Sequence, residues 1–284
     1  MPSDTIEKRI FIVGCSRSGT TVLQVSVASH PRITSFPETF FFLHSTGRLG
    51  RLPLRLGLAS ERTRSALQQS LDEIGRSDLN HRIPTSWRYR PYVDTYLDIL
   101  DEQALDAGAD LWVEKTPMHV HRLGLILQYV PDAHVIHMVR DGRDVVGSIC
   151  HRAREYGGIF EDQEDPSVAV NRWNRALKAS VRYLGQPKHS LVLYEQFVRD
   201  PERSMRRVCR ELGISYDARM AQGTDEAAEA VIPDEKDWIR GAKEPPKEKE
   251  SKFERLFSAA EQRDIEEALD FSLHDRIKNE VDGA

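Results

Sequence analysis

The chain has 284 residues, of which 39% are apolar and 30% charged, with a formal net charge of −5 at pH 7. This length supports one large α/β domain, and the acidic balance excludes attraction of nucleic acid or anionic membranes by overall charge. No apolar run approaches the roughly 20 residues of a membrane helix, and residues 1–9 lack the apolar core of a signal peptide.

Short apolar runs alternate with amphipathic segments along most of the chain. We expect strands where apolar or β-branched residues lie between turn signals, at 9–13, 33–36, 110–113, 134–139 and 190–193. We expect helices at 20–29, 60–74, 91–107, 117–129, 142–155, 167–184, 201–212 and 259–269. This alternation predicts a parallel sheet flanked by helices on both faces, in a single domain over 1–284.

Two segments interrupt this pattern. Residues 49–89 are rich in Arg, Leu and Ser, and we interpret them as a helical insertion or lid. Together with the phenylalanines at 40–42 and Trp87, this insertion is expected to line a substrate pocket. Residues 221–258 are mostly polar, with prolines and mixed Lys and Glu, which is typical of a long surface loop.

The turn between the first strand and the first helix has the form of a P-loop. Gly14 and Gly19 are separated by four residues, and the backbone N–H groups of such a loop bind phosphate oxygens at the helix N-terminus. An ATP- or GTP-binding loop would place Lys after the second glycine, but this chain has Thr20 and Thr21, and its positive charge is Arg17. The missing Lys disfavours a P-loop nucleotide or small-molecule kinase, which is kept as an alternative.

A second anion-binding position is expected after the strand at 134–139. Arg140 follows that strand at the carboxyl edge, where ligands bind in open α/β sheets, and Ser148 lies about two helical turns further on. The planar guanidinium can bind phosphate in a bidentate manner. Asp141 and Asp144 are expected in the first turn of a helix, where acidic residues are favoured.

Charged side chains near two other strand ends are candidates for chemistry. Lys115 lies at a strand end and can point into the same crevice as Arg140. Glu38 follows a strand next to aromatic residues, where partial desolvation would raise its pKa toward the working pH. The alternative is a carboxylate that stabilises a helix N-terminus.

The same sequence offers little for metal or thiol chemistry. His119 and His121 lack the further ligands of a zinc site, so no metal is expected, and we place them on a helix surface or in a pocket lining. The three cysteines, an odd number, predict reduced thiols in a cytoplasmic protein. Cys15 lies inside the loop, where a small packing residue is favoured over a reactive thiol.

These motifs resemble those of the PAPS-dependent sulfotransferases. The segment Ser16-Arg17-Ser18-Gly19-Thr20-Thr21 is similar to their 5′-phosphosulfate motif, and Arg140 with Ser148 is similar to their 3′-phosphate motif. Arg in the loop resembles the bacterial, Golgi and tyrosylprotein members. The resemblance implies PAPS (3′-phosphoadenosine 5′-phosphosulfate) as co-substrate, bound by Ser16, Arg17, Ser18, Gly19, Thr20, Thr21, Arg140 and Ser148.

Two further positions are assigned to the nucleotide by resemblance alone. Tyr194 would contact the adenine or the 3′-phosphate end, or else cap a buried strand. Lys252, in a segment similar to the family's Ser-Lys-Trp, would contact PAPS, although a solvated Lys is the favoured interpretation. Residues 221–258 would then form a C-terminal loop over the nucleotide.

The resemblance also implies the catalytic roles. Cytosolic members read Lys-Thr-His where this chain has Lys115-Thr116-Pro117, so their histidine base is absent here. Similarity to the tyrosylprotein and heparan-type enzymes implies Glu38 as the base. Lys115 and Arg17 would stabilise the leaving oxygen and the sulfonate during in-line transfer to a hydroxyl or amine.

The sequence does not identify the acceptor of the sulfuryl group. The acceptor can be a small molecule, carbohydrate, lipid or peptide, and the oligomeric state is equally open. No nucleic-acid partner and no transmembrane segment are expected. The remaining alternative is a non-catalytic nucleotide-binding relative, which the joint presence of Arg17, Glu38, Lys115, Arg140 and Ser148 disfavours.

Overall fold

A five-stranded parallel sheet forms the centre of the computed structural model, which describes residues 5–231, 246 and 251–283. The strand order is β2-β3-β1-β4-β5. The strands are β1 (Lys8–Gly14), β2 (Ile33–Phe36), β3 (Leu111–Lys115), β4 (His134–Val139) and β5 (His189–Leu193). All five predicted strands are present, and the predicted fold class is confirmed.

The central strand β1 is apolar because both of its faces are covered. Ile10 and Ile12 pack toward one layer of helices, while Phe11 and Val13 pack toward the other, and all four side chains are buried. Such continuous apolar runs are typical of buried parallel strands. Gly14 lies opposite Met138 of β4, so the loop after β1 and the residues after β4 emerge at the same edge of the sheet.

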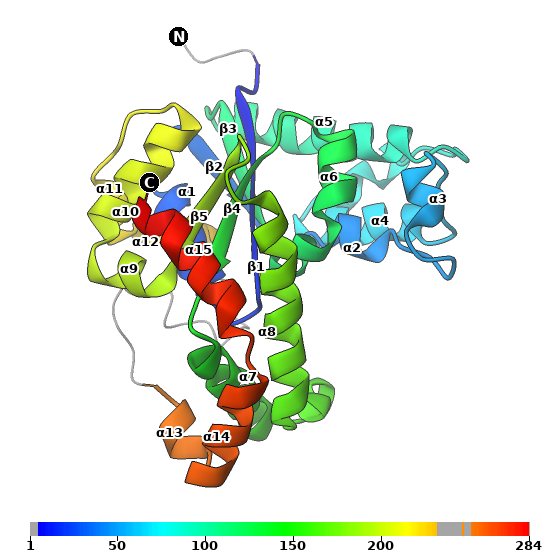
Figure 1. The fold of residues 1–284 in the computed structure, drawn as a ribbon. Helices are drawn as coiled ribbons and strands as arrows, with labels where there is room; N and C mark the ends of the chain where they lie inside the picture. Colours follow the sequence, from blue (N-terminus) through cyan, green and yellow to red (C-terminus); the bar gives the residue numbers. More distant parts are fainter. Residues whose placement is uncertain (1–4, 232–245, 247–250, 284) are drawn as a thin grey trace.

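Helices cover both faces of the sheet (Figure 1). One face carries α1 (Thr20–Ala28), α9 (Tyr194–Arg199), α10 (Pro201–Leu212) and α11 (Arg219–Gln222). The other face carries α5 (Arg90–Asp106), α6 (Leu123–Tyr129), α7 (Gly142–Tyr156), α8 (Pro166–Ser180) and α15 (Phe271–Gly283). The predicted helix at 117–129 is divided into the 3-10 helix η2 (Pro117–Arg122) and α6.

The insertion at 49–89 is largely helical, as predicted. It contains α3 (Leu52–Arg55), α4 (Thr63–Glu73) and the 3-10 helix η1 (Ser77–Arg82) and follows the short helix α2 (Phe41–His44). Phe41 and Phe42 are fully buried and pack against Tyr96, so the expectation that they line a substrate pocket is wrong. Their size and burial place them in the core, whereas Trp87 is 67% exposed.

The C-terminal segment differs in part from the predicted loop. Helices α12 (Asp225–Val231) and α13 (Phe253–Leu256) lie within 221–258, so these parts are helical rather than irregular. The expected loop at 232–245 and 247–250 lies outside the described residues. The chain continues into α14 (Ala259–Ala268), which begins with a capping box from Ser258 and Glu261. None of the described helices is both long and apolar enough to cross a membrane.

Candidate functional site

The loop from Gly14 to Thr21 places the N-terminus of α1 at the carboxyl edge of the sheet. Gly19 has a left-handed backbone (φ 92°), and a Cβ on it would lie 2.4 Å from the ring of Tyr194. Only glycine fits this position without displacing the tyrosine. Arg17 is also left-handed (φ 73°), a conformation uncommon for a residue with a side chain.

Some polar groups at the start of α1 and in this loop lack hydrogen-bond partners within the described part of the chain. No side chain caps α1 there, and the buried hydroxyl of Ser18 has no hydrogen-bond partner. A helix leaves its first backbone N–H groups unsatisfied, and these groups attract anions. The loop therefore fits a ligand that brings several oxygen acceptors, as a phosphate or phosphosulfate does.

The two predicted anion positions converge. The guanidinium of Arg17 donates from Nε to Ser148 Oγ at 3.1 Å, which joins the loop to α7. Arg140 packs its guanidinium 4.2 Å from the ring centre of Tyr194 and forms an ion pair with Asp144 at 3.1 Å. Asp144 thus has a second role beside its expected place in the first helical turn.

Positive charge is concentrated around the loop. Burial and the nearby charges of Arg152 and Arg140 lower the pKa of Arg17 to about 10. Burial and the charge of Lys252 lower the pKa of His151 on α7, and Arg17 contributes to the same shift. An anionic ligand would relieve this repulsion.

The position of Lys252 follows from close packing of α13 on α7. A Cβ on Gly147 would lie 2.9 Å from the backbone nitrogen of Phe253, whose side chain is buried. Lys252 immediately precedes this contact, next to the helix that carries Ser148. The geometry brings Lys252 to the donor side of the site, and its contact with the nucleotide stays a prediction.

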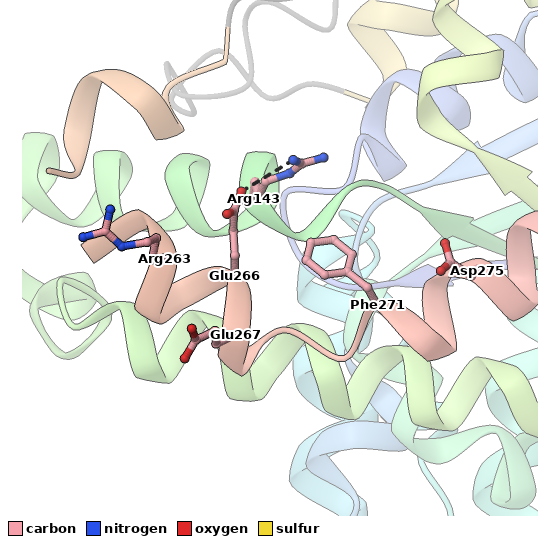
Figure 2. Close-up of a pocket in the computed structure, with 6 residues that line it drawn as sticks. All are labelled: Arg143, Arg263, Glu266, Glu267, Phe271 and Asp275. Carbon is pink, nitrogen blue, oxygen red and sulfur yellow. Dashed lines mark ion pairs between the residues drawn. The ribbon is translucent and has the colours of Figure 1, made fainter. Parts of the chain in front are cut away.

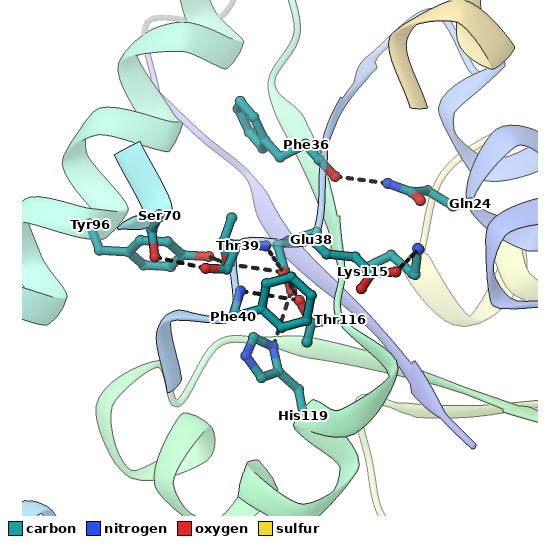
Figure 3. Close-up of polar contacts among 11 residues, drawn as sticks. Gln24, Phe36, Glu38, Thr39, Phe40, Ser70, Tyr96, Lys115, Thr116 and His119 are labelled. Carbon is teal, nitrogen blue, oxygen red and sulfur yellow. Dashed lines mark hydrogen bonds and ion pairs between the residues drawn. The ribbon is translucent and has the colours of Figure 1, made fainter. Parts of the chain in front are cut away.

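Glu38 and Lys115, the predicted base and electrophile, form an ion pair (Figure 3). Lys115 Nζ donates to Glu38 Oε1. The lysine side chain is 6% exposed and the glutamate 27%, so the carboxylate can be reached from solvent. Glu38 lies between β2 and α2, two residues before the N-cap Phe40, and its carboxylate is directed to Lys115.

A buried network holds the segment that carries Glu38, and the sequence analysis missed its centre, Glu114. The Glu114 side chain is fully buried and accepts hydrogen bonds from Thr39 N (3.1 Å), Thr39 Oγ1 (3.0 Å) and Thr116 Oγ1 (2.5 Å). His119 Nδ1 lies 3.2 Å from its other oxygen. Burial alone would raise the pKa of Glu114, but the charge of His119 and these hydrogen bonds lower it.

This network continues into the insertion and the sheet. Ser70 of α4 donates to the carbonyl of Thr39 at 2.8 Å, and the amide of Gln24 donates to the carbonyl of Phe36 at 2.8 Å. The segment before and after Glu38 is therefore fixed by side chains from α1, β3 and α4 (Figure 3). A charged residue within the apolar run of β3 was the available sequence signal for Glu114.

Arg152 is a second residue that the sequence analysis missed. It lies four positions after Ser148, on the same side of α7, and the charge of Glu38 acts on it. Burial and the charge of Arg172 lower its pKa. Arg152 is therefore close enough to interact electrostatically with both Arg17 of the loop and Glu38, and its helical spacing from Ser148 was the available signal.

The histidines and the cysteine considered in the sequence analysis differ in their surroundings. His119 is fully buried beside Glu114, so its expected place on a surface or pocket is wrong, whereas His121 lines a cavity. Among the described residues, no group of three or more metal-ligating side chains occurs. Cys15 is buried and free, and burial raises its pKa to about 12, which disfavours a reactive thiolate.

Comparisons with known proteins extend over most of this site. A family model described as "Sulfotransferase family" matches residues 9–218. The protein-tyrosine sulfotransferase of Drosophila melanogaster is 27% identical over 210 residues, which cover 73% of this chain and 38% of the fly protein. The chain spans about 38% of this fly protein and about half of the protein-tyrosine sulfotransferases of Caenorhabditis elegans and Danio rerio (51% and 53%).

Solved structures share the fold. The sulfotransferase domain of the Synechococcus PCC 7002 olefin synthase aligns with a TM-score of 0.58 at 22% identity, over 90% of this chain and 96% of that domain. Mouse sulfotransferase SULT7A1 complexed with PAP aligns with a TM-score of 0.50 at 14% identity, over 93% and 84% of the two chains. Since the family match includes the loop, Glu38, Lys115, Arg140 and Ser148, this chain belongs to the sulfotransferase family.

Proposed function

We propose that this protein transfers a sulfuryl group from PAPS to a hydroxyl or amine of an acceptor. One observation carries the proposal: the Glu38–Lys115 ion pair stands beside a loop whose Arg17 is hydrogen-bonded to Ser148. A proton acceptor, a cation and two anion positions are thereby combined at one edge of the sheet. Family membership supports the same reaction.

The residues around the loop suit a nucleotide with phosphates at both ends. Backbone N–H groups of the loop, with Thr20 and Thr21, would bind the 5′-phosphosulfate. Arg140 and Ser148 would bind the 3′-phosphate, with Tyr194 beside Arg140 and Lys252 beyond α7. The unpartnered Ser18 hydroxyl and the crowded guanidinium groups support this assignment, because both call for acceptor oxygens.

The chemistry assigned to the protein is proton removal and charge stabilisation. Glu38 accepts the proton of the acceptor as the acceptor oxygen or nitrogen bonds to sulfur and the bond from sulfur to the 5′-phosphate oxygen breaks. Lys115 and Arg17 stabilise the negative charge that develops on the departing oxygen. The proton ends on Glu38, and the electron pair of the broken bond ends on the phosphate.

For the acceptor, we favour a hydroxyl on a peptide or protein. The support is that the curated relatives are named protein-tyrosine sulfotransferases, although each is longer than this chain. The 27% exposure of Glu38 suits an acceptor that approaches from solvent. Transfer of labelled sulfate from PAPS to tyrosine peptides, with sugars, sterols and small phenols in parallel, tests this choice; exclusive labelling of a non-peptide acceptor would replace it.

The roles of Glu38 and Lys115 are tested with Glu38→Gln and Lys115→Ala. We expect Glu38→Gln to lower kcat by about 10²- to 10⁴-fold, the usual contribution of a general base, with the Kd for PAP within twofold. Lys115→Ala should also lower kcat more than PAP affinity. Glu73→Gln, on the exposed side of α4, is the matched control for loss of one carboxylate.

Three outcomes would contradict parts of this proposal. Wild-type turnover in Glu38→Gln would exclude the glutamate as base. A loss of PAP affinity alone in Lys115→Ala would make that residue a binding group. Stronger thermal stabilisation by ATP with Mg²⁺ than by PAP would favour the kinase alternative.

A further inference from the structure

A cavity outside the donor site has an unusual concentration of positive charge. It has a volume of about 440 Å³ and lies between α3, η2, the start of α6, the C-terminal half of α8 and the 3-10 helix η4 (Val181–Tyr183). Its charged lining consists of Arg51, Arg55, Arg122, Arg175, Lys178 and Arg182. His121 also lines the cavity, and burial and the nearby arginines lower its pKa to about 4, so it is neutral at pH 7. No Asp or Glu among the described residues lines it, although the whole chain has 45 acidic and only 40 basic residues.

These six charges also lack counter-ions within the described ranges, where none of them forms an ion pair with a carboxylate. A second pocket, between α7, α14 and α15, is lined by both basic and acidic side chains (Figure 2). There Arg143 pairs with Asp141 at 2.7 Å and with Glu266 at 3.5 Å, so its charge is compensated inside the protein. The basic cavity is not compensated in this way.

Two of the cations, Arg51 and Arg122, are held in position by the backbone of η2. Arg51 donates to the carbonyl of His121 at 2.9 Å, and Arg122 donates to the same carbonyl at 3.4 Å. The Nε of Arg122 is buried without a hydrogen-bond partner among the described residues. Burial and the charges of Arg51 and Arg175 lower the pKa of Arg122, so the group carries an electrostatic penalty that an anion would remove.

The length of the basic surface indicates the size of its ligand. Arg175 and Lys178 of α8 and Arg182 of η4 are spaced by three and four residues, so they follow one side of this continuous helical segment over about 10 Å. Arg51 and Arg55, four residues apart on α3, supply charges from another element of the lining. A single small anion would reach only part of this surface, whereas a molecule with several anionic groups would contact it from end to end.

We propose that this cavity is a second ligand site, which binds a small molecule carrying two or more phosphate or sulfate groups. It is separate from the donor site, because its lining includes none of the loop 14–21, Arg140 or Ser148. The guanidinium groups would form charge-assisted hydrogen bonds to the ligand oxygens. The proposal goes beyond sulfuryl transfer and does not depend on turnover.

Calorimetry with the donor site filled tests the proposal. Full-length protein saturated with PAP is titrated with inorganic tripolyphosphate and, separately, with sucrose octasulfate. We expect one binding site per chain for at least one of the two probes. Its affinity should fall as NaCl is raised from about 0.05 to 0.3 M, because salt screens charge–charge attraction, with a Debye length of about 10 Å at 0.1 M. Preference between the two probes distinguishes a phosphate-bearing ligand from a sulfate-bearing one.

The decisive variant is Arg175→Gln with Lys178→Gln, since both side chains are exposed and their loss should leave the fold intact. We expect at least tenfold weaker binding of the probe, with PAP affinity within twofold. The matched control is Arg276→Gln with Lys278→Gln, two exposed cations of α15, which should keep wild-type binding. Absence of probe binding to the wild type, or equal loss in both double variants, would overturn the site, whereas failed PAP binding would instead count against the donor assignment.

Discussion

His137 gives the sharpest prediction for stability, because it is a titratable side chain sealed inside the sheet. It is fully buried on β4, with Nδ1 3.0 Å from Ser180 Oγ and Nε2 3.0 Å from His189 Nδ1. Burial, and then the charges of His189 and His134, lower its pKa to about 3. In the unfolded chain a histidine has a pKa near 6.5, so below this pH His137 is protonated in the unfolded state but stays neutral in the folded state.

The sign of the effect follows from that difference. Because the pKa of His137 is lowered in the folded state, this residue does not reduce the free energy of unfolding above pH 7.5, where it is neutral in both states. As the pH falls from about 6.5 toward 3, it lowers the free energy of unfolding progressively. Between pH 7.5 and 5.0, the difference between the unfolded and folded pKa values of His137 corresponds to about 2 kcal/mol of lost stability from this residue alone. The free energy of unfolding should therefore be lower at pH 5.0 than at pH 7.5.

Urea unfolding followed by circular dichroism at pH 7.5, 6.0 and 5.0 measures the effect in the wild type and in His137→Gln. The variant has a lower free energy of unfolding at pH 7.5, but its decrease toward pH 5.0 should be smaller by about 2 kcal/mol. His134, which is buried, and His189, which is partly buried, remain in both proteins, so the comparison reports the loss of His137 together with its contact to His189. Equal pH dependence in both proteins would refute the reasoning.

Two further variants test the geometry of the site. Gly19→Ala should weaken PAP binding at least tenfold in calorimetry, because the new Cβ would lie 2.4 Å from the Tyr194 ring. Gly108→Ala is the control, since it is also at positive φ but has no atom within 4 Å of the Cβ. It should lower the free energy of unfolding by only about 1 kcal/mol and leave PAP binding unchanged. Glu114→Gln should lower the free energy of unfolding by about 3 kcal/mol, because an amide replaces the buried carboxylate that accepts from Thr39 and Thr116, and it should also lower kcat through Glu38. A decrease below about 0.5 kcal/mol in urea unfolding, the usual range of surface substitutions, would remove Glu114 from this role.

Much of the fold could be predicted because its elements have strong local signals. The strands β2 and β4 and the helix α10 have the predicted limits, and α10 ends at Gly213, whose left-handed backbone closes the helix. Strand β3 runs two residues further than predicted, through Glu114 and Lys115. Charged residues normally argue against a buried strand. Here Lys115 pairs with Glu38 and Glu114 accepts from Thr39, both distant in the chain, while His119 lies near Glu114 in sequence and in space.

Elements that depend on tertiary contacts were not predicted. Helix α15 was missed because only Ile277 and Val281 of its mostly polar sequence are buried, too few for a clear apolar stripe. The phenylalanines next to Glu38 were assigned to a substrate pocket because local sequence does not distinguish an aromatic pocket from an aromatic core.

The candidate site was predicted in its members but not in its connections. Arg17, Glu38, Lys115, Arg140 and Ser148 were all named from strand ends, the loop or family resemblance. Their pairing, Arg17 with Ser148 and Glu38 with Lys115, joins residues that are distant in the chain and follows only from sheet order. The cationic cavity beside α8 could not be predicted, because its charges come from three separate segments.

The hydrogen bond from Ser70 to the carbonyl of Thr39 has a consequence for how the enzyme could choose its substrate. It ties the insertion to the residue next to Glu38, so a displacement of α4 would shift the carboxylate as well. Substrate selection and reactivity would then be mechanically linked. An ill-fitting acceptor that pushes α4 outward would misalign the proton acceptor, and discrimination would appear in kcat as well as in KM.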